Sequence, residues 1–202
     1  MDNNEYDELF ENYRDYLKFL TIKLGSFFEN QKEYIFCKMG CAKCCKNAEF
    51  PFSLIEIQYA LYGFSKLPDE TKKIIEENLT RVLEEKKKFK GEKFLYTCPY
   101  LVNNVCSIYE YRGVICRTFG LINKVTEGNP KVPFCCFEGQ NYSNVLDEKT
   151  GQLSSKKVKE LGLKEEPTGF NVSYEYLTGQ TYEEVFEFSF GEKKPMIEWL
   201  EG

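Results

Sequence analysis

Nine cysteines and no histidine in 202 residues constrain this chain more than any other feature of its sequence. The cysteines are Cys37, Cys41, Cys44, Cys45, Cys98, Cys106, Cys116, Cys135 and Cys136. The lack of histidine removes every mixed Cys/His zinc pattern and every histidine-based nucleophile system. A metal bound by this chain would therefore be held by thiolates, with at most a carboxylate in addition.

The compartment decides how such cysteines are interpreted. The first sixteen residues are acidic and polar, whereas a secretory signal needs a basic start followed by an apolar stretch. No run of eighteen apolar residues occurs, so we expect no membrane-spanning segment. The net charge of −5 argues against a nucleic-acid partner. We expect a cytoplasmic protein, and in a reducing cytosol clustered cysteines bind metal or do redox work more often than they form disulfides.

The cysteines between Cys37 and Cys45 form the densest group, Cys37-x3-Cys41-x2-Cys44-Cys45. Gly40 and the small Ala42 would let this short loop curl so that its sulfurs point inward. Cysteines from distant segments would complete the coordination. The candidates for these distant ligands are Cys98, Cys106, Cys116, Cys135 and Cys136.

Two adjacent pairs, Cys44-Cys45 and Cys135-Cys136, limit how the thiols can be shared. Neighbouring side chains point in different directions, so both members of a pair rarely bind one ion. Either one member of each pair is not a ligand, or the pairs straddle two nearby centres. Arg112 and Arg117 flank expected ligands and would compensate the negative charge of the bound group; the alternative is that they pair with surface carboxylates.

Hydrophobic spacing predicts mostly helices around these cysteines. Apolar residues at alternating intervals of four and three from Tyr6 to Phe27 predict a helix over residues 3–30, which would pack on the core or, alternatively, form a coiled-coil arm. Ser53 and Glu56 have the spacing of a capping box at the start of a second helix. Further expected elements are a helix over Asp69–Lys90, a hairpin over Tyr100–Ser107, short helices over Tyr109–Arg117 and Ser155–Leu161, a strand over Asn171–Leu177 and a helix over Thr181–Phe190.

We expect one domain over residues 1–202 that is mainly α with minor β, with helices flanking an irregular cysteine-rich lobe. The cysteine-cluster metal-binding region would span residues 37–136, between the helix 3–30 and a C-terminal α+β extension over 140–202. The cysteine-rich lobe looks thin in apolar residues, so bound metal would supply much of its stability.

The ordered cysteine motifs resemble those of the CxxCxxCC family of proposed zinc- or iron-chelating proteins. The resemblance rests on the Cys37–Cys45 group, Cys98-Pro99-Tyr100-Leu101, Cys106-Ser107-Ile108-Tyr109, Arg112 and Cys116-Arg117. It implies a metal centre built from about eight cysteines. Flagellin lysine N-methylases are similar in this arrangement, which links it to S-adenosylmethionine chemistry by analogy. Where the family often has Arg-Pro this chain has Arg112-Gly113, so we expect a looser turn there.

An iron–sulfur cluster, [4Fe–4S], is the leading interpretation and Zn²⁺ the alternative. The three-cysteine loop, the absence of histidine and Pro99 directly after Cys98 favour a cluster, whereas Cys41-x2-Cys44 can serve as a zinc knuckle. The same loop has the spacing of radical S-adenosylmethionine enzymes, but the chain lacks their repeated strand–helix units. A methyl transferase that uses a cluster, and a carrier that hands metal to a partner, are two further classes. No catalytic residue is assigned, and enzymatic activity is left open.

Overall fold

The computed structural model describes residues 3–47, 49–124 and 130–201. Helices hold 53% of the chain and strands 9%, which confirms the mainly α fold with minor β. The α-helices are α1 (Asn3–Asn30), α2 (Lys43–Lys46), α3 (Leu54–Ser65), α4 (Asp69–Lys88), α5 (Val114–Thr118), α6 (Ser155–Glu160), α7 (Tyr174–Leu177), α8 (Gln180–Phe186) and α9 (Met196–Trp199). Single 3-10 segments are η1 (Lys32–Tyr34), η2 (Tyr109–Tyr111), η3 (Phe134–Glu138) and η4 (Ser143–Val145).

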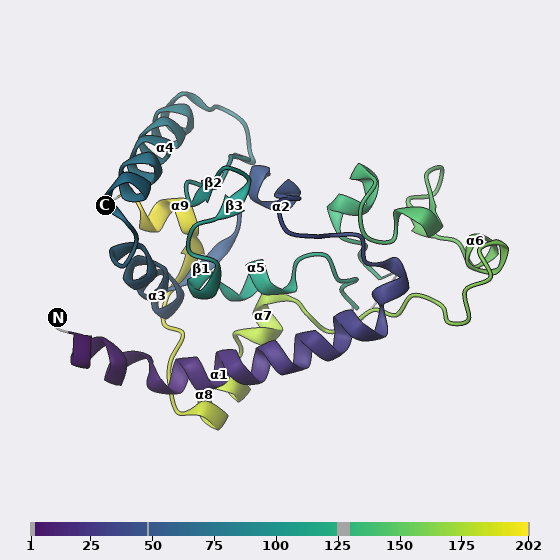
Figure 1. Cartoon of the computed structure of the whole chain (residues 1–202), viewed down its shortest axis with the longest axis horizontal. Coiled ribbons are helices and arrows are strands. Elements are labelled where there is room, and N and C mark those ends of the chain that lie inside the picture. Colours follow the sequence, from purple (N-terminus) through teal and green to yellow (C-terminus); the bar gives the residue numbers. More distant parts are fainter. Residues whose placement is uncertain (1–2, 48, 125–129, 202) are drawn as a thin grey trace.

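In the described residues, six short strands form three antiparallel pairs. Strand β1 (Pro51–Ser53) pairs with β6 (Lys193–Pro195), β2 (Leu101–Val102) with β3 (Val105–Cys106), and β4 (Leu146–Asp147) with β5 (Gln152–Leu153). Figure 1 shows the arrangement that results: α3, α4, α9 and the first two pairs form one lobe, and η3, η4, β4, β5 and α6 form a second lobe at the other end of α1. The chain from η1 to α2 runs between these lobes.

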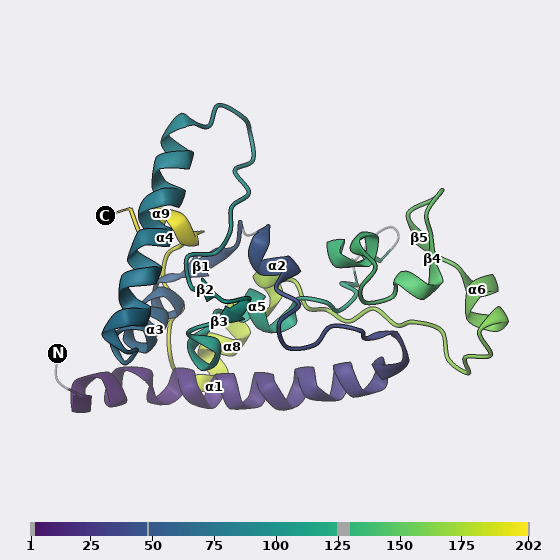
Figure 2. The ribbon, with the colours of Figure 1, turned by 45° about the horizontal axis from the view of Figure 1, so that its top comes forward.

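Helix α1 packs on the core along its apolar face, as predicted, and not as a free coiled-coil arm. Phe10, Tyr13, Leu17, Leu20 and Leu24 are buried, and they pack with residues of α3, α7 and α8. Aromatic pairs cross this interface; Phe10 lies edge-on to Tyr59 with ring centroids 5.1 Å apart. Figure 2 shows α1 as a straight rod beneath the other elements.

A second core lies between α3, α4, the β2–β3 hairpin and α9. Its buried members include Phe52, Ile75, Val82 and Ile108, together with Tyr96 and Tyr100 near the first distant cysteine. The Trp199 indole donates to the Phe52 carbonyl at 2.9 Å and so fixes α9 onto β1. The expectation of a lobe thin in apolar residues is therefore wrong for the segment around Cys98–Cys116. Tyr100 and Ile108 of this segment are themselves buried, and apolar residues distant in sequence pack against them.

The second lobe has its own smaller core. Tyr34 of η1, Tyr142, Val145 and Val158 are buried there together with Cys136. The Tyr142 N–H donates to the Tyr34 carbonyl at 2.7 Å, which ties the end of the N-terminal segment to this lobe.

Of the short elements predicted from the sequence, some are confirmed and others are not. The hairpin is confirmed, and its turn places Asn103 and Asn104 at positive φ, the geometry that suits a tight hairpin. The helix expected over Tyr109–Arg117 is split into η2 and α5. The strand expected over Asn171–Leu177 is wrong: residues Tyr174–Leu177 form α7, because the Ser173 side chain accepts from the Tyr176 N–H and caps a helical turn.

Within the described residues, no helix is both long and apolar enough to span a membrane.

Candidate metal centre

The loop from Cys37 to Cys45 curls through two left-handed residues. Gly40 has φ of 87° and Ala42 φ of 52°, on either side of Cys41. Glycine adopts this conformation without steric cost, and alanine is the smallest residue that carries a Cβ. The curl turns the chain into α2, which carries Cys44 and Cys45. The sequence prediction for this loop is thus matched by its backbone.

Residues 37–43 of this loop contact the segment that follows Cys136. Lys43 Nζ lies 3.0 Å from Glu138 Oε2, and the Cys41 thiol lies 3.8 Å from Gln140 Oε1. These contacts bring the first cysteines of the loop to the side of η3, where Cys135 lies.

Asn141 holds the start of the loop in place. Its side chain has no exposed surface, and its Oδ1 accepts from the N–H groups of Phe36 at 2.9 Å and Cys37 at 2.8 Å. Its Nδ2 donates to the Gly120 carbonyl at 2.9 Å. Sequence reasoning missed this residue, because a single Asn beside a turn carries no signal that it will be buried.

The other end of the loop contacts the second cysteine segment. The Cys98 N–H donates to the Cys45 carbonyl at 2.7 Å, and the Leu101 N–H donates to the Cys98 carbonyl at 3.0 Å. Leu101 is paired with Cys106 across the hairpin. Cys98, Cys106 and Cys116 all pack against the second core, so three distant cysteines share one side of α2.

Burial controls the charge state of these three thiols. It raises the pKa of Cys98 to about 12, and the charge of nearby Cys106 adds to the effect. It also raises the pKa of Cys106, and it raises that of Cys116 well above its ordinary value. The thiols therefore keep their protons until a cation displaces them.

The thiols on the η3 side influence one another in the same way. Burial raises the pKa of Cys37 to about 11, and Cys41 is the next cause. It raises the pKa of Cys135 to about 12, with added effects of Cys37, Cys44 and Cys41. Cys136 differs, since burial alone raises its pKa, to about 11.

Cys44 and Cys45 are an asymmetric pair. Their sulfurs lie 3.9 Å apart. Donation from the Cys45 thiol lowers the pKa of Cys44 to about 7, and the positive charge of Arg112 contributes a smaller lowering. The same hydrogen bond raises the pKa of Cys45. Among the cysteines with a shifted pKa, Cys44 therefore ionises most easily to the thiolate that binds metal.

Both predicted arginines lie beside the thiols and bind backbone oxygens. Arg112 stacks over the Tyr109 ring, with Cζ 3.5 Å from the ring centroid, and its buried Nε has no hydrogen-bond partner. Arg117 donates to the carbonyls of Glu110 at 2.7 Å and Arg112 at 3.2 Å. Over the described residues neither forms a salt bridge with a carboxylate. Their charge is therefore free to act on the thiols, and both lower the pKa of Cys106.

Glu56 positions the helix that carries Cys116. Its fully buried carboxylate accepts from the Ser53 N–H at 2.8 Å and from the Ser53 hydroxyl at 2.7 Å, which confirms the paired Ser53–Glu56 cap. It also accepts from the Val114 N–H at 2.7 Å and from the Tyr174 hydroxyl. One side chain therefore joins the starts of α3 and α5 to α7, a role that the capping motif alone does not reveal.

The cysteines suit a metal by the chemistry of their thiols and by the way the fold brings their segments together. Across the described residues, no three Cys, Asp or Glu side chains already converge closely enough to hold an ion. The structure does bring thiols from three segments to the two sides of α2, next to two arginines. Thiolates alone suit zinc and iron–sulfur clusters. A bound group would cross-link these segments and add positive charge among the thiols.

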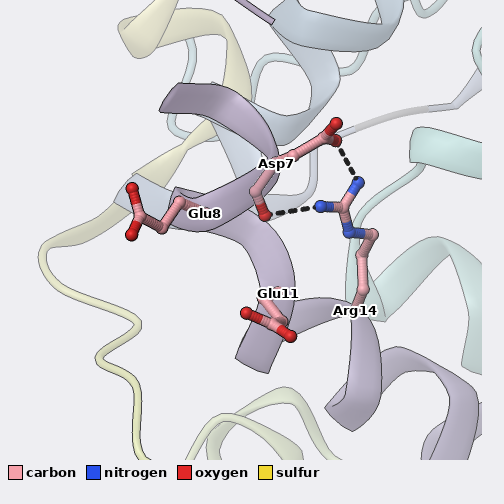
Figure 3. Close-up of a pocket in the computed structure, with 4 residues that line it drawn as sticks. All are labelled: Asp7, Glu8, Glu11 and Arg14. Carbon is pink, nitrogen blue, oxygen red and sulfur yellow. Dashed lines mark hydrogen bonds and ion pairs between the residues drawn. The ribbon is translucent and has the colours of Figure 1, made fainter. Parts of the chain in front are cut away.

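Two surface hollows of the described residues lie away from the cysteines. Figure 3 shows one of about 460 Å³ at the start of α1, lined by Asp7, Glu8, Glu11 and Arg14. Arg14 Nη1 lies 2.9 Å from Asp7 Oδ1 within it, so its charge is already compensated. A second groove of about 490 Å³ lies between α1, α3 and residues 187–191. Neither is lined by a cysteine, and neither belongs to the candidate centre.

A helical scaffold that gathers thiols from separate segments defines the class of cysteine-cluster proteins. The CxxCxxCC family model, described as "Putative zinc- or iron-chelating domain", matches residues 36–136, half of the chain. The chain belongs to this family. Neither a curated protein nor a solved structure matches it.

Proposed function

We propose that this protein binds metal through thiolates alone and that its resident group is a [4Fe–4S] cluster. The observation that carries the proposal is the convergence on α2: Cys45 is hydrogen-bonded to the Cys98 segment, while Cys41 and Lys43 contact the segment after Cys136. A packed core alone would need no such gathering of thiols.

Charge supports the same proposal. Clusters and zinc sites with four thiolates are anionic, and the guanidinium groups of Arg112 and Arg117 would offset part of that charge. The absence of histidine and Pro99 after Cys98 favour a cluster over zinc. We also propose that the protein works in the cytoplasm, where a reducing environment favours metal binding by clustered cysteines over disulfide formation.

Metal analysis of protein purified without oxygen tests the proposal. We expect brown protein that contains iron and acid-labile sulfide in similar amounts, with no metal retained after all nine cysteines are changed to serine. Colourless protein with stoichiometric zinc would refute the cluster and keep the thiolate centre. Protein that takes up neither metal would refute both.

A further inference from the structure

We propose that the cysteines form two separate four-thiolate centres, one on each side of α2, and that Cys136 belongs to neither. The hairpin group is Cys45, Cys98, Cys106 and Cys116. The η3 group is Cys37, Cys41, Cys44 and Cys135. This inference rests on the proposed function and deepens it, because it states how many centres there are and which thiols each one uses.

The hairpin group is assembled by backbone pairing and a shared core. The hydrogen bond of 2.7 Å from Cys98 N–H to the Cys45 carbonyl places the Cys98 segment against α2. Pairing across β2 and β3 brings Cys106 to the same hairpin. Cys116 reaches it from α5, whose first N–H is fixed by Glu56, and Cys98, Cys106 and Cys116 pack on the second core.

The η3 group is assembled by side-chain contacts across the two lobes. Asn141 fixes Cys37, Gln140 contacts the Cys41 thiol, and Glu138 pairs with Lys43 next to Cys44. All three contacting residues follow Cys135 within six positions of the chain. The loop therefore lies along η3 over the length that carries Cys37, Cys41 and Cys44.

The Cys44–Cys45 pair lies on α2, between the two groups. Successive side chains on an α-helix diverge by about 100°. The Cys45 carbonyl faces the Cys98 segment, whereas Lys43, on the other side of Cys44, reaches η3. Cys44 lies between the groups, with its sulfur 3.9 Å from that of Cys45. We assign Cys44 to the η3 group and Cys45 to the hairpin group, which gives each centre four thiolates and makes the two centres neighbours.

Cys136 is accounted for by packing. Its exposed fraction is 1%, and it is a buried member of the third core with Tyr34 and Val145. Eight ligands and one packed thiol then account for all nine cysteines.

The two centres differ in access to solvent. Cys37 is exposed, and Met39 in the same loop has an exposed fraction of 91%. The hairpin group is backed by the second core on one side. A chelator should therefore remove metal from the η3 centre first and from the hairpin centre later.

Anaerobic titration of the metal-free full chain with Co²⁺ tests the proposal, because four-thiolate Co²⁺ gives intense absorption bands that report each filled site. We expect saturation at about two equivalents. Cys37→Ser and Cys44→Ser should each remove one equivalent, and so should Cys106→Ser and Cys116→Ser. A Cys37→Ser/Cys106→Ser double variant should bind none, and Cys136→Ala, the matched control, should keep both. EDTA should remove Co²⁺ from the wild type in two phases. The fast phase should be absent in Cys37→Ser.

The Co²⁺ titration distinguishes failure of the two-centre assignment from failure of thiolate metal binding itself. Wild-type protein that binds no Co²⁺, zinc or iron overturns the thiolate centre itself. Saturation at one equivalent, or loss of all Co²⁺ in Cys37→Ser with helical circular dichroism unchanged, overturns the two centres and leaves metal binding intact. Loss of one equivalent in Cys136→Ala overturns the assignment of that residue. Should Cys116→Ser unfold, Cys106→Ser on the hairpin answers the same question.

Discussion

Gly113 fills the position at which this family often has proline, and the turn there is tightly packed. A Cβ on Gly113 would lie 2.7 Å from Phe52 Cζ and 3.0 Å from Glu56 Oε1. The looser turn expected from the sequence is therefore wrong. Glycine is required because an aromatic ring and a carboxylate from β1 and α3 occupy the space that a side chain would need.

Gly113→Ala is expected to lower the free energy of unfolding by about 1–3 kcal/mol, because the buried Phe52 ring must shift to make room. Denaturant unfolding of the two proteins measures this difference. Gly25→Ala is the matched control: a Cβ at Gly25 in α1 meets nothing within 4 Å, so it should be neutral or slightly stabilising. Equal effects of the two substitutions would contradict the packing argument.

Asn141 contributes through three buried hydrogen bonds. Asn141→Ala leaves two N–H groups and one carbonyl without these partners, so the free energy of unfolding should fall by about 1–3 kcal/mol. If the η3 centre exists, its Co²⁺ affinity should also fall while the hairpin centre keeps its own. Asn12→Ala, which removes a single exposed hydrogen bond to the Glu187 carbonyl, serves as the control. Unchanged Co²⁺ binding at both centres would show that Asn141 acts on stability alone.

At the scale of elements, Glu56 of α3 binds residues of β1, α5 and α7, and a neutral amide cannot replace it. Glutamine offers an –NH₂ group where the carboxylate accepts, so at least one of the Val114 and Ser53 donors would face another donor. Glu56→Gln should lower the free energy of unfolding by about 1–3 kcal/mol. Glu77→Gln on the exposed face of α4 should change it little. A Glu56→Gln protein as stable as the wild type would mean that these hydrogen bonds add nothing net.

The cost of Glu56→Gln should also depend on pH. Burial raises the pKa of Glu56 above its ordinary value of 4.5, although hydrogen bonds from Tyr174 and Ser53 oppose the rise. A raised folded-state pKa contributes stability that is fully present below the unfolded pKa and is lost as pH rises through the folded pKa. The difference in unfolding free energy between wild type and Glu56→Gln should therefore be larger near pH 4 than at pH 7. A difference that grows with pH would mean that the hydrogen bonds outweigh burial.

Elements with strong local signals were predictable and those set by distant partners were not. The stripe on α1, the charged α4 and the Asn103–Asn104 turn follow from spacing and turn chemistry alone. Val172 and Tyr174 alternate with polar residues as in a strand, yet the Ser173 cap and the Tyr16 hydroxyl on the Leu177 carbonyl favour a helical turn. For the site, spacing identified the thiols but could not reveal Asn141 or Gln140, whose roles arise only when the lobes meet.

At the scale of the molecule, we propose that the chain forms a single domain. Helix α1 packs on the first core, and its end stacks Phe27 on Phe170 with ring centroids 4.0 Å apart, next to the second lobe. The Cys37–Cys45 loop adds another connection between the lobes.

Metal removal should loosen that loop before it loosens the helices. In the metal-free protein we expect limited proteolysis to cut between Lys38 and Asn47 first, because this loop is held by a few side-chain contacts and the backbone hydrogen bond from Cys98 to Cys45. The Cys98–Cys116 segment should stay protected by the second core. Mass spectrometry of the first fragments, with metal-loaded protein as control, measures this order. Equal resistance of both forms in the loop would mean that the metal adds little to the fold.

The pairing of β1 with β6 also has a consequence for how the protein is made. Strand β6 and α9 complete the second core, against which Cys98, Cys106 and Cys116 pack, yet they lie well after Cys136 in the chain. Synthesis runs from the N-terminus, so all nine thiols exist before the residues that close this core have been added. The growing chain thus presents all nine thiols before β6 and α9 have been added to the second core. Insertion during translation would meet less steric hindrance than insertion into the finished protein, and thiols left empty at that stage would be open to oxidation.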